Sequence, residues 1–201
     1  MAALTSYSDV TVVPRIAVTL PLALPLPDGF DVERLQTWPT TNGRLEFVAG
    51  RLEYMPPCGE AQQRTAADVV TELSLWRRTH PGFVVGGNEA GMLLGGEVRA
   101  ADAAVWRSAP ATDGLARTAP ILVVEVAGVD DTEALLEAKA RWYLAHGVGT
   151  VWIVVPEART AKVVTAQGQV VVGGGNARMP EPAGLSGLTP TVASFFAQME
   201  G

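Results

Sequence analysis

A strand that is apolar on both faces decides the fold, and it lies in residues 120–131, PILVVEVAGVDD. Residues 121–126 are apolar at every position except Glu125, which is typical of a strand covered on both sides of its sheet. An ionised carboxylate in such an interior is costly unless it is paired, hydrogen-bonded, bound to a metal or protonated. Glu125 therefore has a partner there, or else it lies at the strand end with its carboxylate in water.

The segments on either side of this strand alternate between strand and helix patterns. Before it we expect a short helix at 30–38, a hairpin around Ala49-Gly50, a helix at 65–78, and strands at 83–85, 91–94 and 103–106. After it we expect a helix at 133–145, a strand at 151–155, and a hairpin at 162–166 and 170–172. This order predicts an α/β (α+β) protein with a mixed sheet and helices on its faces.

The composition divides the 201 residues into three parts. Residues 1–27 are apolar but repeatedly broken by proline, which predicts an extended arm rather than a membrane helix or a secretory signal. Residues 28–172 are expected to form one globular domain, and residues 173–201 a Gly- and Pro-rich loop with a short helix near 192–199. Because one small domain does not easily cover such an arm, we expect a homodimer and no membrane association.

The supply of reactive side chains and the charge exclude several kinds of site. A single cysteine, Cys58, excludes an internal disulfide and a cysteine-based zinc cluster, and it fits a reducing, cytoplasmic environment. The chain has two histidines, which are too few for a histidine-rich metal site and make a Ser-His-Asp triad a weak candidate. The net charge of −6 argues against broad phosphate binding but leaves room for a local basic groove.

Two acids lie on consecutive expected strands. Asp102 begins the strand ADAAVW, and Glu125 lies toward the end of ILVVEV. If these strands pair, two carboxylates meet at one place, which is tolerated chiefly when a cation lies between them. Oxygen ligands favour Mg²⁺ or Mn²⁺. Glu46 is a third candidate, although its alternation with Leu45 and Phe47 is equally consistent with a glutamate that faces solvent.

Lys139 lies on the helix that follows the Glu125 strand. The face of this helix that turns to the sheet is marked by four apolar residues, Leu135, Leu136, Trp142 and Tyr143. Lys139 falls three or four residues from each, so it is expected to point inward, where its ammonium needs an anion such as Asp102 or Glu125. The alternative is that its stem packs on Tyr143 while its ammonium reaches solvent.

The chain resembles the Uma-type restriction endonuclease family in four segments that follow one another in the same order: LEFVAGRLEYMPP, VRAADAAVW, PILVVEVAG and KARWYLAHGVGTVWIVVP. That family is a branch of the PD-(D/E)XK nuclease superfamily. The resemblance covers about residues 30–166. It implies a restriction-endonuclease-like fold, a mixed central β-sheet flanked by helices, and a nuclease that uses Mg²⁺ or Mn²⁺.

The same resemblance implies roles for single residues. Asp102 and Glu125 match the metal-binding acids, and Glu46 matches the glutamate of the first hairpin. The superfamily's lysine normally follows the second acid by two residues, where this chain has Ala127; in the Uma-type branch a lysine on the next helix takes its place, and Lys139 matches it. These four residues are the catalytic candidates.

The resemblance further suggests Gln62 and Tyr143 as substrate-binding residues. Gln62 stands where the family usually has a histidine, and Ala101, Gly128 and Leu135 replace its usual proline, serine and aspartate. The chain thus keeps the residues that match the metal-binding acids, but several of the family's accessory residues are replaced.

These observations predict a metal-dependent endonuclease that hydrolyses DNA phosphodiester bonds without an organic cofactor. One alternative is a non-catalytic module of the same fold, which the acidic charge and the thinned accessory groups favour. The other is a metal-dependent hydrolase of small phosphodiesters, which an acidic surface suits better than a long duplex.

Overall fold

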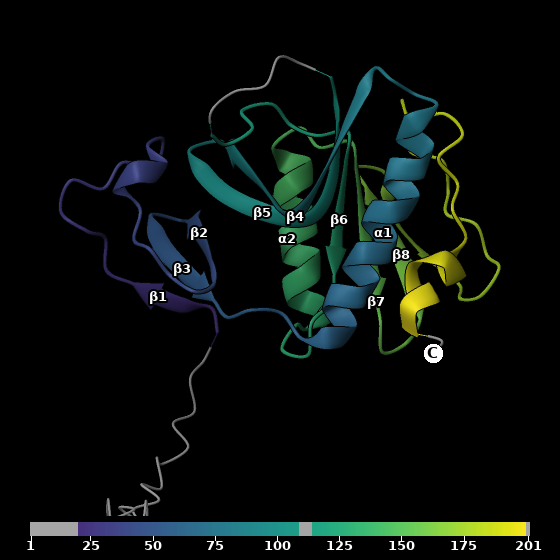
Figure 1. Ribbon diagram of the computed structural model, residues 1–201, viewed down its shortest axis with the longest axis horizontal. Helices are drawn as coiled ribbons and strands as arrows, with labels where there is room; N and C mark the ends of the chain where they lie inside the picture. Colours follow the sequence, from purple (N-terminus) through teal and green to yellow (C-terminus); the bar gives the residue numbers. More distant parts are fainter. Residues whose placement is uncertain (1–19, 109–113, 200–201) are drawn as a thin grey trace, which may run out of the picture.

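The computed structural model describes residues 20–108 and 114–199, which are coloured along the sequence in Figure 1. Its elements are, in chain order, β1 (Leu22–Leu24), η1 (Leu35–Thr37), β2 (Arg44–Val48), β3 (Arg51–Met55), α1 (Glu60–Arg78), β4 (Phe83–Leu94), β5 (Glu97–Arg107), β6 (Leu122–Val126), α2 (Glu133–Ala145), β7 (Thr150–Val155), β8 (Thr160–Thr165), β9 (Gly168–Val172) and η2 (Val192–Met199).

The described residues contain one nine-stranded sheet with the order β1-β3-β2-β5-β6-β7-β8-β9, and β4 pairs with β5 beside this path. The β6 and β7 strands are parallel, and the chain between them forms α2, as a parallel pair requires a crossover. The remaining pairs of strands are antiparallel. The predicted mixed sheet with flanking helices is confirmed.

Helices cover both faces of this sheet, which gives the three layers visible in Figure 1. One core cluster joins α1 and η2 to the sheet, and the other joins α2 to its opposite face. Along β6, Leu122, Val124 and Val126 belong to the α1 cluster, whereas Val123 belongs to the α2 cluster. Because side chains alternate along a strand, Glu125 shares the α2 face with Val123.

The predicted hairpin is present, with β2 and β3 joined at Ala49-Gly50. Both turn residues have positive φ, 48° and 77°, as a tight two-residue hairpin turn requires. The β2 strand then meets β5 at the single pair Phe47↔Val98. This narrow attachment leaves Glu46 beside β5.

Several predicted elements differ from the structure, and the strand expected at 103–106 begins earlier, at Glu97. The helix expected at 30–38 is a single 3-10 turn, Leu35–Thr37, and the helix expected from residue 65 begins at Glu60. The strands expected at 83–85 and 91–94 form one strand, β4, with a register shift between Gly87 and Ala90. Gly86 and Gly87 lie between the two predicted strands, and glycine weakens the sequence pattern of a strand. A Cβ at Gly87 would lie 2.7 Å from Val70 of α1, so the close packing of this helix accounts for Gly87.

Both ends of the described chain pack on the sheet layers. The β1 strand, within the predicted arm, adds to β3. Most of that arm, residues 1–19, lies outside the described residues, so the homodimer that rests on it stays a prediction. In the C-terminal part the buried Met179, Leu185 and Leu188 join the α1 cluster, and Trp76 Nε1 donates to the Ser186 carbonyl at 2.9 Å.

Among residues 20–108 and 114–199, no helix combines the length and apolar character needed to cross a membrane.

Candidate active site

Asp102 and Glu125 meet where the β5–β6 ladder ends. The last pair of that ladder is Ala103↔Val124, so Asp102 and Glu125 would form the next pair in the same register. Instead, the Val126 amide donates to Asp102 Oδ2 at 2.7 Å, and the strands stop pairing at the two acids. The pairing of β5 with β6 therefore brings both carboxylates to one place, and both are buried.

Glu125 is held by two side chains of α2. Tyr143 donates its hydroxyl to Oε1 at 2.8 Å, and Lys139 Nζ donates to Oε2 at 2.8 Å. Burial and the nearby Asp102 carboxylate raise the pKa of Glu125 to about 7. These two effects outweigh the opposite effect of the Lys139 ammonium, which lowers this pKa. Burial likewise raises the pKa of Asp102. The acid therefore has partners, and the alternative of a carboxylate in water at the strand end is wrong.

Lys139 points to the acids, as the inward reading predicted. Its side chain is 15% exposed, and its ammonium also lies 3.5 Å from Glu46 Oε1 and 3.4 Å from the Ala100 carbonyl. Burial by itself lowers the pKa of Lys139, but Glu125 and Glu46 outweigh burial and raise it. Lys139 is thus a fixed cation, and the alternative with its ammonium in solvent is wrong.

Leu135 corrects one part of the helix prediction. It was expected on the face turned to the sheet, but it is 52% exposed, while Leu136, Ala140 and Tyr143 are buried. The covered face of α2 is therefore narrower than its apolar residues suggest.

Glu46 is buried, with 2% of its surface exposed, so the solvent-facing reading of its strand is wrong. The Ala100 amide donates to Glu46 Oε1 at 3.2 Å, and Arg44 Nε lies 3.5 Å from the same oxygen. Burial opposes its ionisation, but Lys139, Arg44 and this amide together lower the pKa of Glu46. Glu46 is thus held in its ionised form, and it shares the Lys139 ammonium with Glu125.

The two substrate-binding candidates occupy different environments. Gln62 lines a cavity next to Asp102, and its amide donates to the Val126 carbonyl at 3.0 Å. Tyr143 is fully buried beneath the sheet, and its bond to Glu125 fixes that carboxylate. The substrate-binding role of Tyr143 stays a prediction, and the contact that the structure shows is with Glu125.

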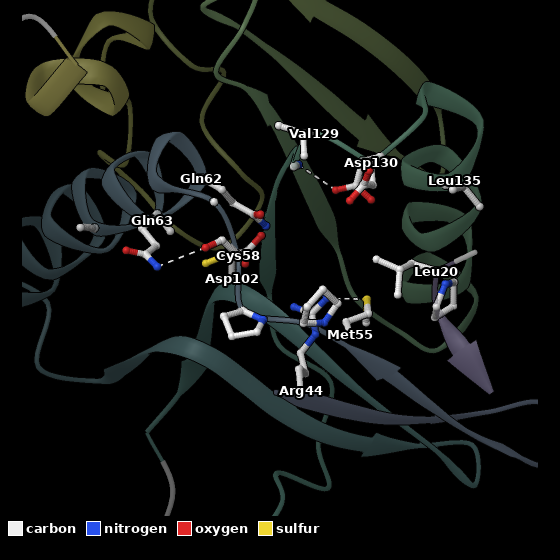
Figure 2. Close-up of a pocket in the computed structure, with 18 of the residues that line it drawn as sticks. Leu20, Arg44, Met55, Cys58, Gln62, Gln63, Asp102, Val129, Asp130 and Leu135 are labelled. Atoms are coloured by element: carbon white, nitrogen blue, oxygen red, sulfur yellow. Dashed lines mark hydrogen bonds between the residues drawn. The ribbon is translucent and has the colours of Figure 1, made fainter. Parts of the chain in front are cut away.

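The cavity beside Asp102 has a volume of about 840 Å³. Figure 2 shows its labelled lining residues around an opening between α1 and the two connections that precede α1 and α2. Of the three clustered acids, only Asp102 is among the described lining residues. Arg44 also lines the cavity and comes from the same strand as Glu46.

Sequence reasoning did not select Arg44. The available signal was its place two residues before Glu46 on an alternating strand, which puts both side chains on one face. This signal is weak, because strand alternation does not show which of its two faces is buried.

The donor set of the cluster fits a hard divalent cation. Among the described residues no group of three or more His, Cys, Asp or Glu side chains has metal-binding geometry. Mg²⁺, however, usually takes one or two carboxylates and completes its shell with water and substrate phosphates. Asp102 and Glu125 supply two such carboxylates, and their mutual repulsion favours a cation between them.

Glu125→Gln is expected to stabilise the metal-free protein at about pH 8 by on the order of 1–3 kcal/mol, with little effect near pH 5. The Glu125 pKa in the folded protein is about 7 instead of 4.5, so folding strengthens proton binding. Stability is therefore lost as pH rises from the lower value through the higher one, whereas glutamine stays neutral. Glutamine also keeps both contacts, because its carbonyl accepts from Lys139 and its amide donates to the Tyr143 hydroxyl.

Urea unfolding of both proteins in EDTA, at several pH values, measures this difference. Parallel stability profiles across the whole range would contradict it.

Comparisons with known proteins support the fold and identify a family. The model of the Uma2 family, described as "Putative restriction endonuclease", matches residues 32–193. A solved structure from Anabaena variabilis, described as a putative nuclease belonging to DUF820, superposes with a TM-score of 0.74 at 17% identity, covering 84% of this chain and 98% of that one. No curated protein matches. The solved structure supports the fold, and because the family model spans most of the chain, the protein belongs to the Uma2 restriction endonuclease family.

Proposed function

We propose that this protein hydrolyses DNA phosphodiester bonds with a divalent cation, Mg²⁺ or Mn²⁺, held by Asp102 and Glu125. The observation that carries the proposal is the buried acid pair at the end of the β5–β6 ladder, with the Lys139 ammonium 2.8 Å from Glu125 and a cavity beside Asp102. Membership of a restriction endonuclease family supports a nuclease-like activity. The metal and the DNA substrate are our inference from the chemistry of the cluster.

Each residue of the cluster has a distinct part in this proposal. Asp102 and Glu125 bind the cation, and Tyr143 fixes the orientation of Glu125. When bound, the cation supplies Lewis-acid polarisation of the phosphoryl oxygen and charge stabilisation in the transition state. Asp102 lies at the cavity and presents its carboxylate to the substrate side of the site.

Lys139 acts through its charge. Its pKa is raised, so it is protonated near neutral pH and does not serve as a general base. A fixed ammonium between Glu46 and Glu125 orients the attacking water by hydrogen bonding and stabilises negative charge that develops on the phosphoryl group. Glu46 holds Lys139 and Arg44 in place.

A substrate panel tests the proposal. Purified protein is incubated with supercoiled plasmid, a short single-stranded oligonucleotide and bis(p-nitrophenyl) phosphate, each with Mg²⁺, Mn²⁺ or EDTA. We expect metal-dependent cleavage of the DNA substrates and none in EDTA. Absence of metal-dependent cleavage of every substrate would contradict the proposal and favour a binding module of the same fold.

A second candidate is a metal-dependent hydrolase of small phosphodiesters. The charge of the cavity favours it, because three of its lining residues, Asp102, Asp130 and Asp131, are acids. Rapid cleavage of the small phosphodiester with none of either DNA would select this function.

A further inference from the structure

We propose that the cavity beside Asp102 takes one unpaired deoxynucleotide of a single strand, with its phosphate on Arg44 and its base against the apolar wall that begins at Met55. This inference rests on the proposed function and names the substrate class of the same site. It predicts that an unpaired DNA strand binds more tightly than the same strand in a duplex.

Arg44 is placed to bind a phosphate. It lines the cavity together with Asp102, and its side chain is largely buried. Its Nε lies 3.5 Å from Glu46, and its Nη2 contacts Met55 Sδ at 3.2 Å, so the guanidinium is held from two sides by the β2–β3 hairpin. A guanidinium held in this way loses little freedom on binding and matches the geometry of a phosphate. Figure 2 shows Arg44 directed toward Met55 at the edge of the cavity.

An apolar wall adjoins this cation. Met55 ends β3, and Pro56 and Pro57 follow it in the connection to α1. Prolines have fixed φ angles and no amide donors, so this part of the wall is stiff and offers only contact surface. Val70 and Ala67 of α1 line the same cavity. Unpaired bases are held between such apolar surfaces in sites that accept single nucleotides.

The size and charge of the cavity select one unpaired strand over a duplex. Its volume of about 840 Å³ lies within the range of pockets for small ligands, so it suits a nucleotide and not a double helix. Of the described residues lining it, Arg44 is the one cation, whereas Asp130 and Asp131 are acids on the connection to α2. Duplex affinity grows with the number of neutralised phosphates, and a second strand near these acids would lose affinity.

Fluorescence anisotropy tests the inference with a short labelled DNA strand, alone or annealed to its complement. Ca²⁺ replaces Mg²⁺, and gels verify that the probe stays intact. We expect the single strand to bind about tenfold more tightly than the duplex, the scale of one base contact. Equal binding, or tighter binding of the duplex, would overturn the inference. A ribonucleotide strand of the same sequence is the third probe, and tighter binding of that RNA would overturn the assignment to DNA.

Two variants locate the binding. Arg44→Met is expected to weaken binding of the single strand about tenfold and to reduce the salt slope by about 0.7, the value for one lost phosphate contact. Arg44→Lys should recover part of the affinity. Ala67→Phe fills the cavity from an exposed position on α1 and should also weaken binding, whereas Ala138→Phe, exposed on α2 and outside the lining, should not.

The result is independent of catalysis. If the protein shows this binding pattern but cleaves no substrate, the nucleotide site is supported and the proposed hydrolysis is contradicted. A wild-type protein that binds no DNA, or an Ala67→Phe variant that binds like the wild type while folded by circular dichroism, overturns the nucleotide site itself.

Discussion

Asp102→Asn is expected to abolish Mn²⁺ binding and to reduce DNA cleavage by about a thousandfold or more, since one of the two proposed carboxylate ligands is lost. Asparagine suits this test better than alanine. Its side-chain oxygen still accepts from the Val126 amide, the bond that Asp102 Oδ2 makes at 2.7 Å, so no buried donor is left unpaired. Titration calorimetry with Mn²⁺ and plasmid nicking measure the two effects.

Asp130→Asn is the matched control for this substitution. Asp130 is an exposed acid that lines the same cavity, so the control removes one nearby charge without touching the acid pair. It should keep Mn²⁺ binding and cleavage. If Asp102→Asn bound Mn²⁺ as tightly as the wild type, the metal site would have to lie elsewhere.

Lys139→Met is expected to bind Mn²⁺ and fold, yet to cleave DNA about a hundredfold more slowly or worse, the scale of one electrostatic contribution. Methionine keeps most of the length of the stem and removes only the ammonium. Lys139 donates to Glu125 and lies close to Glu46, so its loss leaves the negative charge of these acids uncompensated. That charge then repels the negative charge that develops on the phosphoryl group in the transition state. Single-turnover cleavage at saturating Mn²⁺ measures the chemical step.

Lys162→Met is its control. Lys162 is similarly enclosed, with 13% of its side chain exposed against 15% for Lys139, and it is bonded to Glu133 and Glu137 of the same helix. Its substitution removes a lysine ion-pair network outside the acid cluster, whose acids are more exposed than Glu125 and Glu46, so cleavage should persist. If Lys139→Met cleaved DNA as fast as the wild type, the role of this lysine would be structural and not catalytic.

Much of the local structure follows from the sequence. The two-residue turn at Ala49-Gly50 favours the hairpin, and the continuous apolar run marks β6 as buried on both faces. The helix expected at 133–145 has the same bounds as α2, and Thr132 caps its start by accepting from the Leu135 amide. These features were predictable because hydrophobic period, turn and cap each act within a few residues.

The composition of the acid cluster was only partly predictable. The sequence predicts that Asp102 and Glu125 meet if their strands pair, and the structure shows that β5 and β6 do pair. For Glu46 and Lys139 the sequence left two readings each, and the structure selected the buried one for both. Arg44 was not selected at all.

The physical reason for this division is that a strand's alternation defines two faces but does not say what covers them. Glu46 is buried because β2 meets β5 at one pair, and Tyr143 reaches Glu125 because α2 packs beneath β6. The sequence by itself therefore determined most of the elements and the sheet class, since these depend on local backbone geometry. Tertiary packing alone decided which charges are enclosed together, because burial and ion pairing arise from contacts between segments far apart in the chain.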